Sequence, residues 1–295
     1  MTTLTEPLAP GTTAWARKIT ASKVAAILGL SPYDSPLSCW HRMKGNIPLE
    51  QETEDHRRGH YAEPAILAWW RDQHPEIDEV DLQPQYRRPD LPWAAATPDA
   101  RAWGGAQPVV LAEAKTARNL DEWGEPGTDE IPAYYYVQTQ FQMHVSGVER
   151  CYVPVWGSWF EMAEYIVDYD PDIATGIIAR CAQFWASLEA DTPPPLDDTV
   201  ATLQVLKALH PDIEKDATVQ LEPTTAVEYV EAKNALEEAE ARHRAAQSAV
   251  LDAMGNAQYA NAGEVRVARR QPARGGAVAL YRVAKTPTAI TGEEA

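Results

Sequence analysis

The sequence predicts an α/β protein: a core with a central mixed β-sheet flanked by helices, followed by a mainly helical C-terminal extension. Three strand-like segments follow one another between two helical patterns: 81–88, 93–103 and 109–115. The three prolines at 193–195 then separate this part from an Ala/Glu-rich segment. Because such a run is typical of a domain boundary, we expect a core over 1–192 and an extension over 193–295.

The first segments are an arm and a short helix. Residues 1–14 show no apolar periodicity, so we expect a loose arm there. Ser22–Leu28 has the pattern of a helix capped by Thr20 or Ser22. Simple capping explains the serine, and a hydroxyl that receives a phosphate beside exposed helix-start amides is the functional alternative.

A longer helix is predicted over Arg57–Gln73, with Tyr61 and Leu67 on its apolar face. Glu63 and Pro64 interrupt that face. Because proline has no backbone N–H, it indicates a helix start or a kink, and either one gives Glu63 an unusual local geometry.

The segments after the predicted strands complete the core. A helix is expected from Pro132 to about Val145, and its Gln138 and Gln142 share one face with bulky tyrosines. Glutamines between tyrosines leave room for at least one turned inward. A β-hairpin over 151–169 and an amphipathic helix over 172–188 follow.

The extension has a different character. A short helix is predicted over 200–209 and a long one over 227–254, and alternating apolar residues over 265–283 indicate a strand pair. No internal repeat is visible, and the last residues have the composition of a disordered end.

The formal net charge of −17 argues against a nucleic-acid partner, although an enzyme that uses a local groove needs only local basic residues. Such clusters exist. Arg17, Lys18 and Lys23 lie near the start, and 263–292 contains six Lys/Arg and one acid.

The three cysteines are widely spaced, which favours reduced, buried thiols in a cytoplasmic protein over a disulfide framework. They also lack the grouping that a zinc or iron–sulfur site needs. No apolar run reaches the length of a membrane span, and the N-terminus lacks the pattern of a signal peptide, so we expect no membrane partner.

The residues with the clearest chemistry lie within 96–115. Side chains alternate along a strand, so Glu113 and Lys115 are expected on the same face, and the intervening turn brings Asp99 back beside them. Two carboxylates on one hard cation, with an amine alongside, are the equipment of metal-assisted phosphodiester hydrolysis. By spacing alone such a string is common, and it indicates this chemistry only about one time in ten.

Five motifs in a fixed order make the string more specific. They are ITASKVAAILGLSPYDSP (19–36), GHYAEP (59–64), ATPDA (96–100), EAK (113–115) and YYVQTQFQMHVSG (135–147). With them, residues from about 15 to 190 resemble the YqaJ-type viral recombinases. That family is the branch of the PD-(D/E)xK nuclease superfamily that includes the phage-lambda-type exonuclease, and it implies a restriction-endonuclease-like core.

The resemblance also implies metal ligands. Asp99 and Glu113, helped by the backbone carbonyl of Ala114, would bind catalytic Mg²⁺ or Mn²⁺, with two ions per site. Glu63 would contact the second metal or its water.

Two further catalytic roles follow from the same resemblance. Lys115 would orient or activate the attacking water and neutralise charge on the phosphate. Gln138 would position that water or the lysine.

A pocket for a 5′-phosphate is implied around Ser22. The family often places an arginine seven residues before this serine, where the chain has Trp15. Arg17, Lys18 and Arg118 are the candidates that replace it.

The implied activity is 5′→3′ exonucleolytic hydrolysis of double-stranded DNA ends, which supplies single strands to a phage annealing protein. Lambda-type members form rings around DNA, so a homotrimer encoded by a phage or prophage in a bacterial host is implied as well. The alternatives are a RecB-like endonuclease or other end-processing nuclease, and a non-catalytic DNA-end-binding scaffold. The intact charged set disfavours the scaffold, because an inert protein has no need to keep costly charges together.

Overall fold

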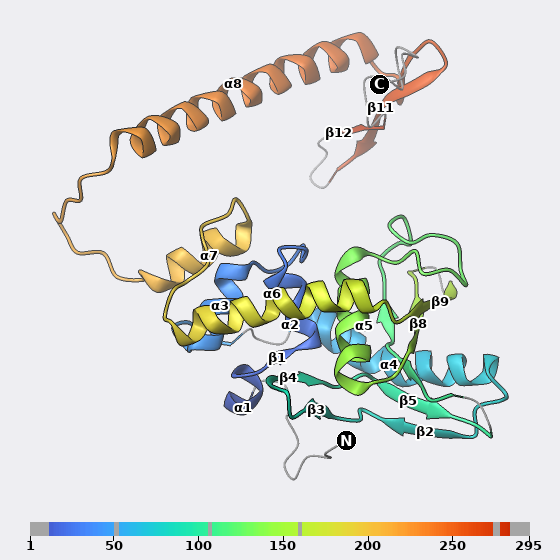
Figure 1. The fold of residues 1–295 in the computed structure, drawn as a ribbon. Coiled ribbons are helices and arrows are strands. Elements are labelled where there is room, and N and C mark those ends of the chain that lie inside the picture. The colour runs from blue at the N-terminus through green and yellow to red at the C-terminus, as the bar shows by residue number, and fades with distance from the viewer. Residues whose placement is uncertain (1–11, 50–52, 106–107, 159–160, 274–277, 284–295) are drawn as a thin grey trace. The chain divides into compact units, whose positions relative to one another are not determined.

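A computed structural model describes residues 12–49, 53–105, 108–158, 161–273 and 278–283 (Figure 1). Their contacts divide the chain into two units, Met1–Ile213 and Glu214–Ala295. No helix within the described ranges is long and apolar enough to cross a membrane.

The first unit alternates helices and strands, which confirms the predicted α/β class. Its helices are α1 (Thr13–Ala16), α2 (Ala21–Ile27), α3 (Pro36–Lys44), α4 (Glu54–Gln73), α5 (Ala133–Ser146), α6 (Pro171–Glu189) and α7 (Val200–Leu209). Its strands are β1 (Ile19–Thr20), β2 (Glu79–Leu82), β3 (Tyr86–Arg88), β4 (Leu91–Ala96), β5 (Ala100–Trp103), β6 (Val110–Ala112), β7 (Lys115–Thr116), β8 (Arg150–Trp156) and β9 (Met162–Asp168).

The central sheet is mixed, as predicted. Its order is β2-β5-β6-β8-β7, and β9 pairs with β8. β6 and β7 both pair with β8 in parallel, with Leu111 opposite Cys151 and Lys115 opposite Val155, whereas β9 pairs antiparallel. A parallel pair needs a crossover connection. Helix α5 lies in the connection between β7 and β8, which brings the chain back beside β6 and β7.

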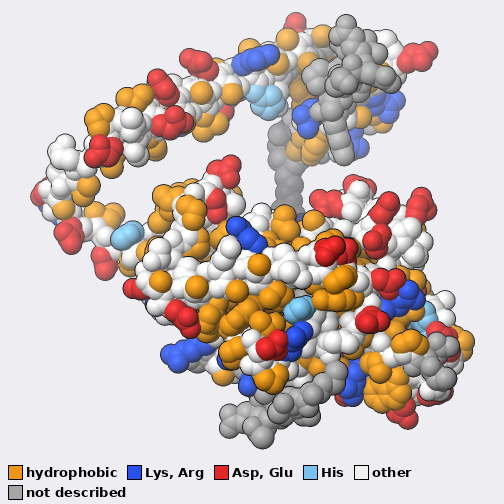
Figure 2. All heavy atoms as spheres, viewed as in Figure 1, with side chains coloured by type: hydrophobic (Ala, Val, Ile, Leu, Met, Phe, Trp, Pro, Cys, Tyr) orange, Lys and Arg blue, Asp and Glu red, His pale blue; other side chains and the backbone are white. Residues whose placement is uncertain are grey.

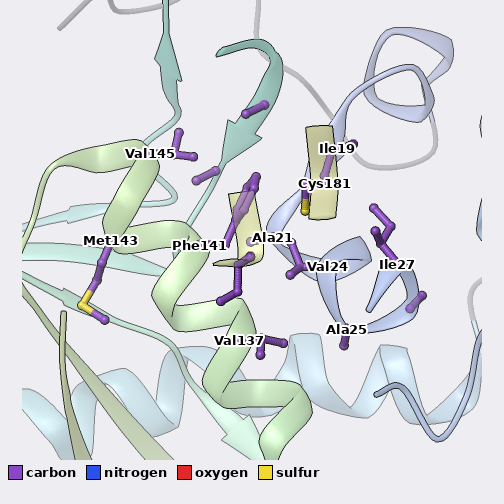
Figure 3. Packing of buried hydrophobic residues seen from close by; sticks show 14 of the residues in the cluster. Ile19, Ala21, Val24, Ala25, Ile27, Val137, Phe141, Met143, Val145 and Cys181 are labelled. Carbon is purple, nitrogen blue, oxygen red and sulfur yellow. The ribbon is translucent and has the colours of Figure 1, made fainter. Parts of the chain in front are cut away.

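Helices cover both faces of this sheet. Leu111 belongs to one core cluster with Phe141 of α5, and Figure 3 shows α2 and α5 side by side in that cluster. Ala112 belongs to a second cluster with Trp70 of α4. Since side chains alternate along a strand, the next residue, Glu113, belongs on the α5 face.

The predicted strand 93–103 is wrong as a single element. β4 lies in a three-stranded sheet of order β1-β4-β3, whereas β5 lies in the central sheet. Pro98 lies between them and lacks the N–H that a continuous ladder requires. Asp99 is therefore placed where the chain passes from one sheet to the other. The predicted strand 109–115 is likewise divided into β6 and β7.

Three expectations concern the N-terminal half. Of the predicted arm, 1–11 lie outside the described residues, and α1 begins at Thr13. The N-cap of α2 is Thr20, one of the two predicted caps, so Ser22 lies inside the helix. Pro64 is not a helix start, because α4 begins at Glu54 after a capping box formed by Thr53 and His56.

The second unit contains α8 (Pro223–Met254) and an antiparallel sheet of β10 (Tyr259–Ala262), β11 (Val265–Pro272) and β12 (Val278–Arg282). The predicted long helix is confirmed. The predicted strand pair is a three-stranded sheet, because 259–262 also pairs with β11. The predicted disordered end, 284–295, lies outside the described residues.

Helix α7 packs against the rest of the first unit. The Thr202 hydroxyl donates to Ser35 Oγ at 2.8 Å, and both residues are buried. Val205 of α7 is also buried. Contacts therefore divide the chain after Ile213, whereas the proline run had suggested a core that ends at 192.

Candidate active site

Glu113 lies at the centre of the candidate site, and only 5% of its surface is exposed. Its Oε1 accepts from Lys115 Nζ at 2.7 Å and from Gln138 Nε2 at 2.6 Å. Its Oε2 accepts from Gln142 Nε2 at 2.8 Å. A buried carboxylate is costly unless it is paired and hydrogen-bonded, and these three donors supply that compensation.

Gln142 is a site residue that sequence reasoning missed. The sequence places it one helical turn after Gln138 on the same face of α5, and that spacing was the available signal. The structure turns both side chains toward Glu113, and Gln142 is almost completely buried. The two glutamines therefore hold the two oxygens of one carboxylate.

Asp99 lies beside this group. Its Oδ2 accepts from the backbone N–H of Ala114 at 2.8 Å. Burial and the nearby carboxylates of Glu113 and Glu63 raise the pKa of Asp99 well above its ordinary value, against the opposing effect of Lys115. The three carboxylates thus leave an excess of negative charge that favours a bound cation.

Lys115 is the positive charge of the site. Besides its ion pair with Glu113, its Nζ lies 4.8 Å from the centre of the Tyr135 ring. Burial lowers the pKa of Lys115, but the carboxylates of Glu113 and Asp99 outweigh it and raise the pKa above its ordinary value. The amine therefore stays protonated at neutral pH and acts here as a cationic donor.

Gln83 is a second residue that the sequence did not reveal. Its side-chain Nε2 donates to Glu63 Oε1 at 3.2 Å, and its backbone N–H donates to the Asp99 carbonyl at 2.9 Å. Its backbone has a positive φ of 50°, which is uncommon for a residue other than glycine. Gln83 therefore connects α4 with the loop that contains Asp99. No local sequence pattern encodes this connection.

The oxygen atoms of the site fit a hard divalent cation. Within the described ranges, no group of three or more His, Cys, Asp or Glu side chains is arranged to hold a metal ion. Mg²⁺, however, is commonly bound by one or two carboxylates together with substrate phosphates and water. Asp99 and Glu113 provide such carboxylates, and within the described chain Oδ1 of Asp99 accepts no hydrogen bond.

The four predicted phosphate-binding residues are not joined to this group. Ser22 is exposed and lies 3.1 Å from the Thr20 hydroxyl, and Arg17 is exposed. Lys18 Nζ donates to the Pro92 carbonyl at 2.6 Å, and Arg118 forms an exposed ion pair with Asp55 at 3.0 Å. No hydrogen bond or ion pair links any of the four to Asp99 or Glu113 among the described residues.

A mixed sheet with helices on both faces, and an Asp and a Glu-x-Lys on neighbouring strand ends, defines the class as a PD-(D/E)xK-type α/β fold. Residues 13–149 match the model of the YqaJ-like viral recombinase domain. This match confirms the resemblance drawn from the motifs. A comparison with curated proteins finds no match.

Two solved structures are similar to this chain. LHK-Exo in complex with dAMP has a TM-score of 0.50 and 20% sequence identity, and the match covers 67% of this chain and 95% of that one. An alkaline exonuclease, LHK-Exo, from Laribacter hongkongensis has a TM-score of 0.47 and 23% identity, with 61% and 94% covered. The first of these supports the shared core fold.

Proposed function

We propose that the chain is a metal-dependent DNA exonuclease that degrades double-stranded ends in the 5′→3′ direction. The observation that carries this proposal is the buried Glu113–Lys115 ion pair beside Asp99, whose pKa is raised by burial and by neighbouring carboxylates. Strongly perturbed pKa values cluster at functional sites. The YqaJ-like domain and the fold shared with LHK-Exo support the same activity.

Some of these residues would bind the metal ions, and Lys115 would stabilise charge. Asp99 and Glu113, with Glu63 and the Ala114 carbonyl, would hold two Mg²⁺ or Mn²⁺ ions. Such ions polarise the phosphate and lower the pKa of a bound water. Protonated Lys115 would stabilise charge that develops on the phosphate, because it lies in a mostly buried site where electrostatic interactions are strong.

Gln138 would hold Glu113 and Lys115 in position for the substrate, because Gln138 and the Lys115 amine both donate to Oε1 of Glu113. Ser22, Arg17, Lys18 and Arg118 remain the proposed contacts to a 5′-phosphate.

The product of this reaction is single-stranded DNA, which a phage annealing protein would take up in the bacterial cytoplasm. We extend the proposal to a homotrimeric ring, because a basic channel inside a ring reconciles local clusters of Arg and Lys with a net charge of −17. DNA binding by such a channel weakens as salt rises.

The activity is tested with linear double-stranded DNA bearing 5′-phosphate or 5′-hydroxyl ends, in Mg²⁺ or in chelator. We expect nucleotides to be lost from 5′ ends only with the metal, and the rate to fall at least about a hundredfold in Asp99→Ala and Lys115→Ala. Asp252→Ala and Lys233→Ala on α8 make the same changes in charge outside the core and serve as matched controls.

Three outcomes would redirect the proposal. Undiminished cleavage by a folded Asp99→Ala variant would remove the site. Nicking of closed circular DNA would favour the endonuclease alternative, and end binding without cleavage would favour the scaffold.

A further inference from the structure

The small sheet of the second unit carries a row of side chains that the proposed nuclease site does not use. Arg269 of β11 is in register with Tyr259 of β10 on one side and with Tyr281 of β12 on the other. Residues directly opposite one another in a sheet point to the same face. The two tyrosines therefore flank the arginine on one face.

An arginine side chain lies near each tyrosine ring on this face. The Arg266 guanidinium lies 3.9 Å from the centre of the Tyr259 ring, and that of Arg269 lies 5.5 Å from the centre of the Tyr281 ring. Both tyrosines are over 40% exposed, and both arginines are exposed. We call these four residues the Tyr–Arg face.

The opposite face of the sheet makes the contacts that hold the unit together. Ala268 is buried, and the Arg270 guanidinium donates to the Gly255 carbonyl at the end of α8. Arg282 lies in register with Ala268 and next to Tyr281, so it belongs to this opposite face. The Tyr–Arg face is thus left exposed by the packing of its own unit.

Its charge contrasts with that of the rest of the chain. The described residues of 259–282 include four arginines and one acid, Glu264, whereas α8 has six acids and three Lys/Arg. Figure 2 shows blue side chains on the sheet, and red side chains interspersed with orange ones along α8. In a chain of net charge −17, a cationic and aromatic face fits an anionic ligand with flat rings.

We propose that the Tyr–Arg face binds single-stranded DNA. Exposed aromatic rings and guanidinium planes stack on bases that a single strand leaves accessible, while arginine charges attract the phosphates. A duplex keeps its base faces stacked inside, so these rings would gain nothing from it. The source of the strand rests on the proposed function, but the binding itself does not.

The experiment measures binding of a fluorescent thymidine oligonucleotide of about 20 nucleotides to the full chain, in EDTA, over a series of salt concentrations. The Arg266→Ala/Arg269→Ala variant is expected to bind more weakly, and its log–log salt dependence should become shallower by about 1.4. Tyr281→Ala should weaken binding about five- to tenfold without changing that slope.

Two variants serve as matched controls. Tyr281→Phe keeps the ring and should keep the affinity. Arg282→Ala removes one charge from the opposite face of the same sheet and should bind within about twofold of the wild type. Circular dichroism of every variant checks that the sheet and α8 remain folded.

The proposal is overturned if the Tyr–Arg variants bind like the wild type, if Arg282→Ala weakens binding as much as they do, or if the face favours blunt duplex. Cleavage is measured separately in Mg²⁺. Intact cleavage with binding insensitive to these variants would overturn the Tyr–Arg assignment alone, whereas sheet-dependent binding without any cleavage would overturn the proposed nuclease alone.

Discussion

Gln142 Nε2 donates to Oε2 of Glu113 at 2.8 Å, while Gln138, one turn earlier on α5, donates to Oε1 of the same carboxylate. The helix thus fixes both the position and the plane of a carboxylate that follows β6. Since Oε1 is also bonded to Lys115, the orientation of the amine depends on α5 as well.

We expect Gln142→Leu to damage both stability and cleavage. It removes a donor from a buried carboxylate, which costs about 1–3 kcal/mol in the free energy of unfolding. It also frees Glu113 to rotate, so the cleavage rate per folded molecule should fall at least about tenfold. Urea unfolding and a DNA-degradation assay at a temperature where the variant is folded measure the two effects.

Gln140→Leu provides the matched control. Gln140 is equally buried on the same helix, but its side chain bonds the Asp168 carbonyl and the Asp170 N–H instead of Glu113. It should lose similar stability and retain cleavage. If both variants cleave at the same rate when folded, Gln142 has no role in positioning Glu113.

Gln83→Gly separates a functional contact from backbone strain. The substitution removes the bond from Gln83 to Glu63, while glycine accepts the positive φ that glutamine adopts with strain. Relief of strain offsets the greater freedom of glycine in the unfolded chain, so the free energy of unfolding should change by no more than about 1 kcal/mol. Cleavage should decrease because Glu63 loses its support.

Asp216→Gly is the comparison for this variant. Asp216 also has a positive φ, of 64°, and it lies in the second unit. Its replacement should leave cleavage unchanged. Full activity in Gln83→Gly would show that Glu63 needs no hydrogen bond from this side chain.

The parts of the site that follow a local rule were predictable from the sequence. Glu113 and Lys115 share a face because they are two apart, and the structure joins them directly. The bond from Gln83 to Glu63 joins a strand end to the middle of a helix, and no periodicity encodes it. Pro98 signals a break between Trp93 and Trp103, but no local pattern shows that the segments on its two sides enter different sheets.

The packing of α7 predicts where the chain can be shortened. A chain that ends at Ile213 keeps the bond between Thr202 and Ser35 and the buried Val205, whereas one that ends at 192 loses both and exposes the α3 surface. We expect the shorter chain to lose about 2–4 kcal/mol of unfolding free energy relative to the chain ending at 213. Equal stability of the two in urea would support the boundary that the proline run suggested.

Asp99 should make the metal-free protein less stable at neutral pH. Burial and neighbouring carboxylates raise its pKa, so between the ordinary value near 4 and the raised value the folded state binds more protons than the unfolded state. By linkage, the free energy of unfolding then falls as pH rises through that window. Asp99→Asn removes the charge and should therefore be more stable than the wild type at pH 7 in EDTA, with the difference vanishing below about pH 4.

Asp90→Asn is the control with the opposite sign. The hydrogen bond from Arg88 lowers the pKa of Asp90, so this variant should lose stability at neutral pH and not in acid. Added Mg²⁺ should stabilise the wild type more than Asp99→Asn, because only the wild type offers the charged ligand. Urea unfolding from pH 3.5 to 8 tests both variants, and parallel curves for the wild type and Asp99→Asn would contradict a raised pKa at Asp99.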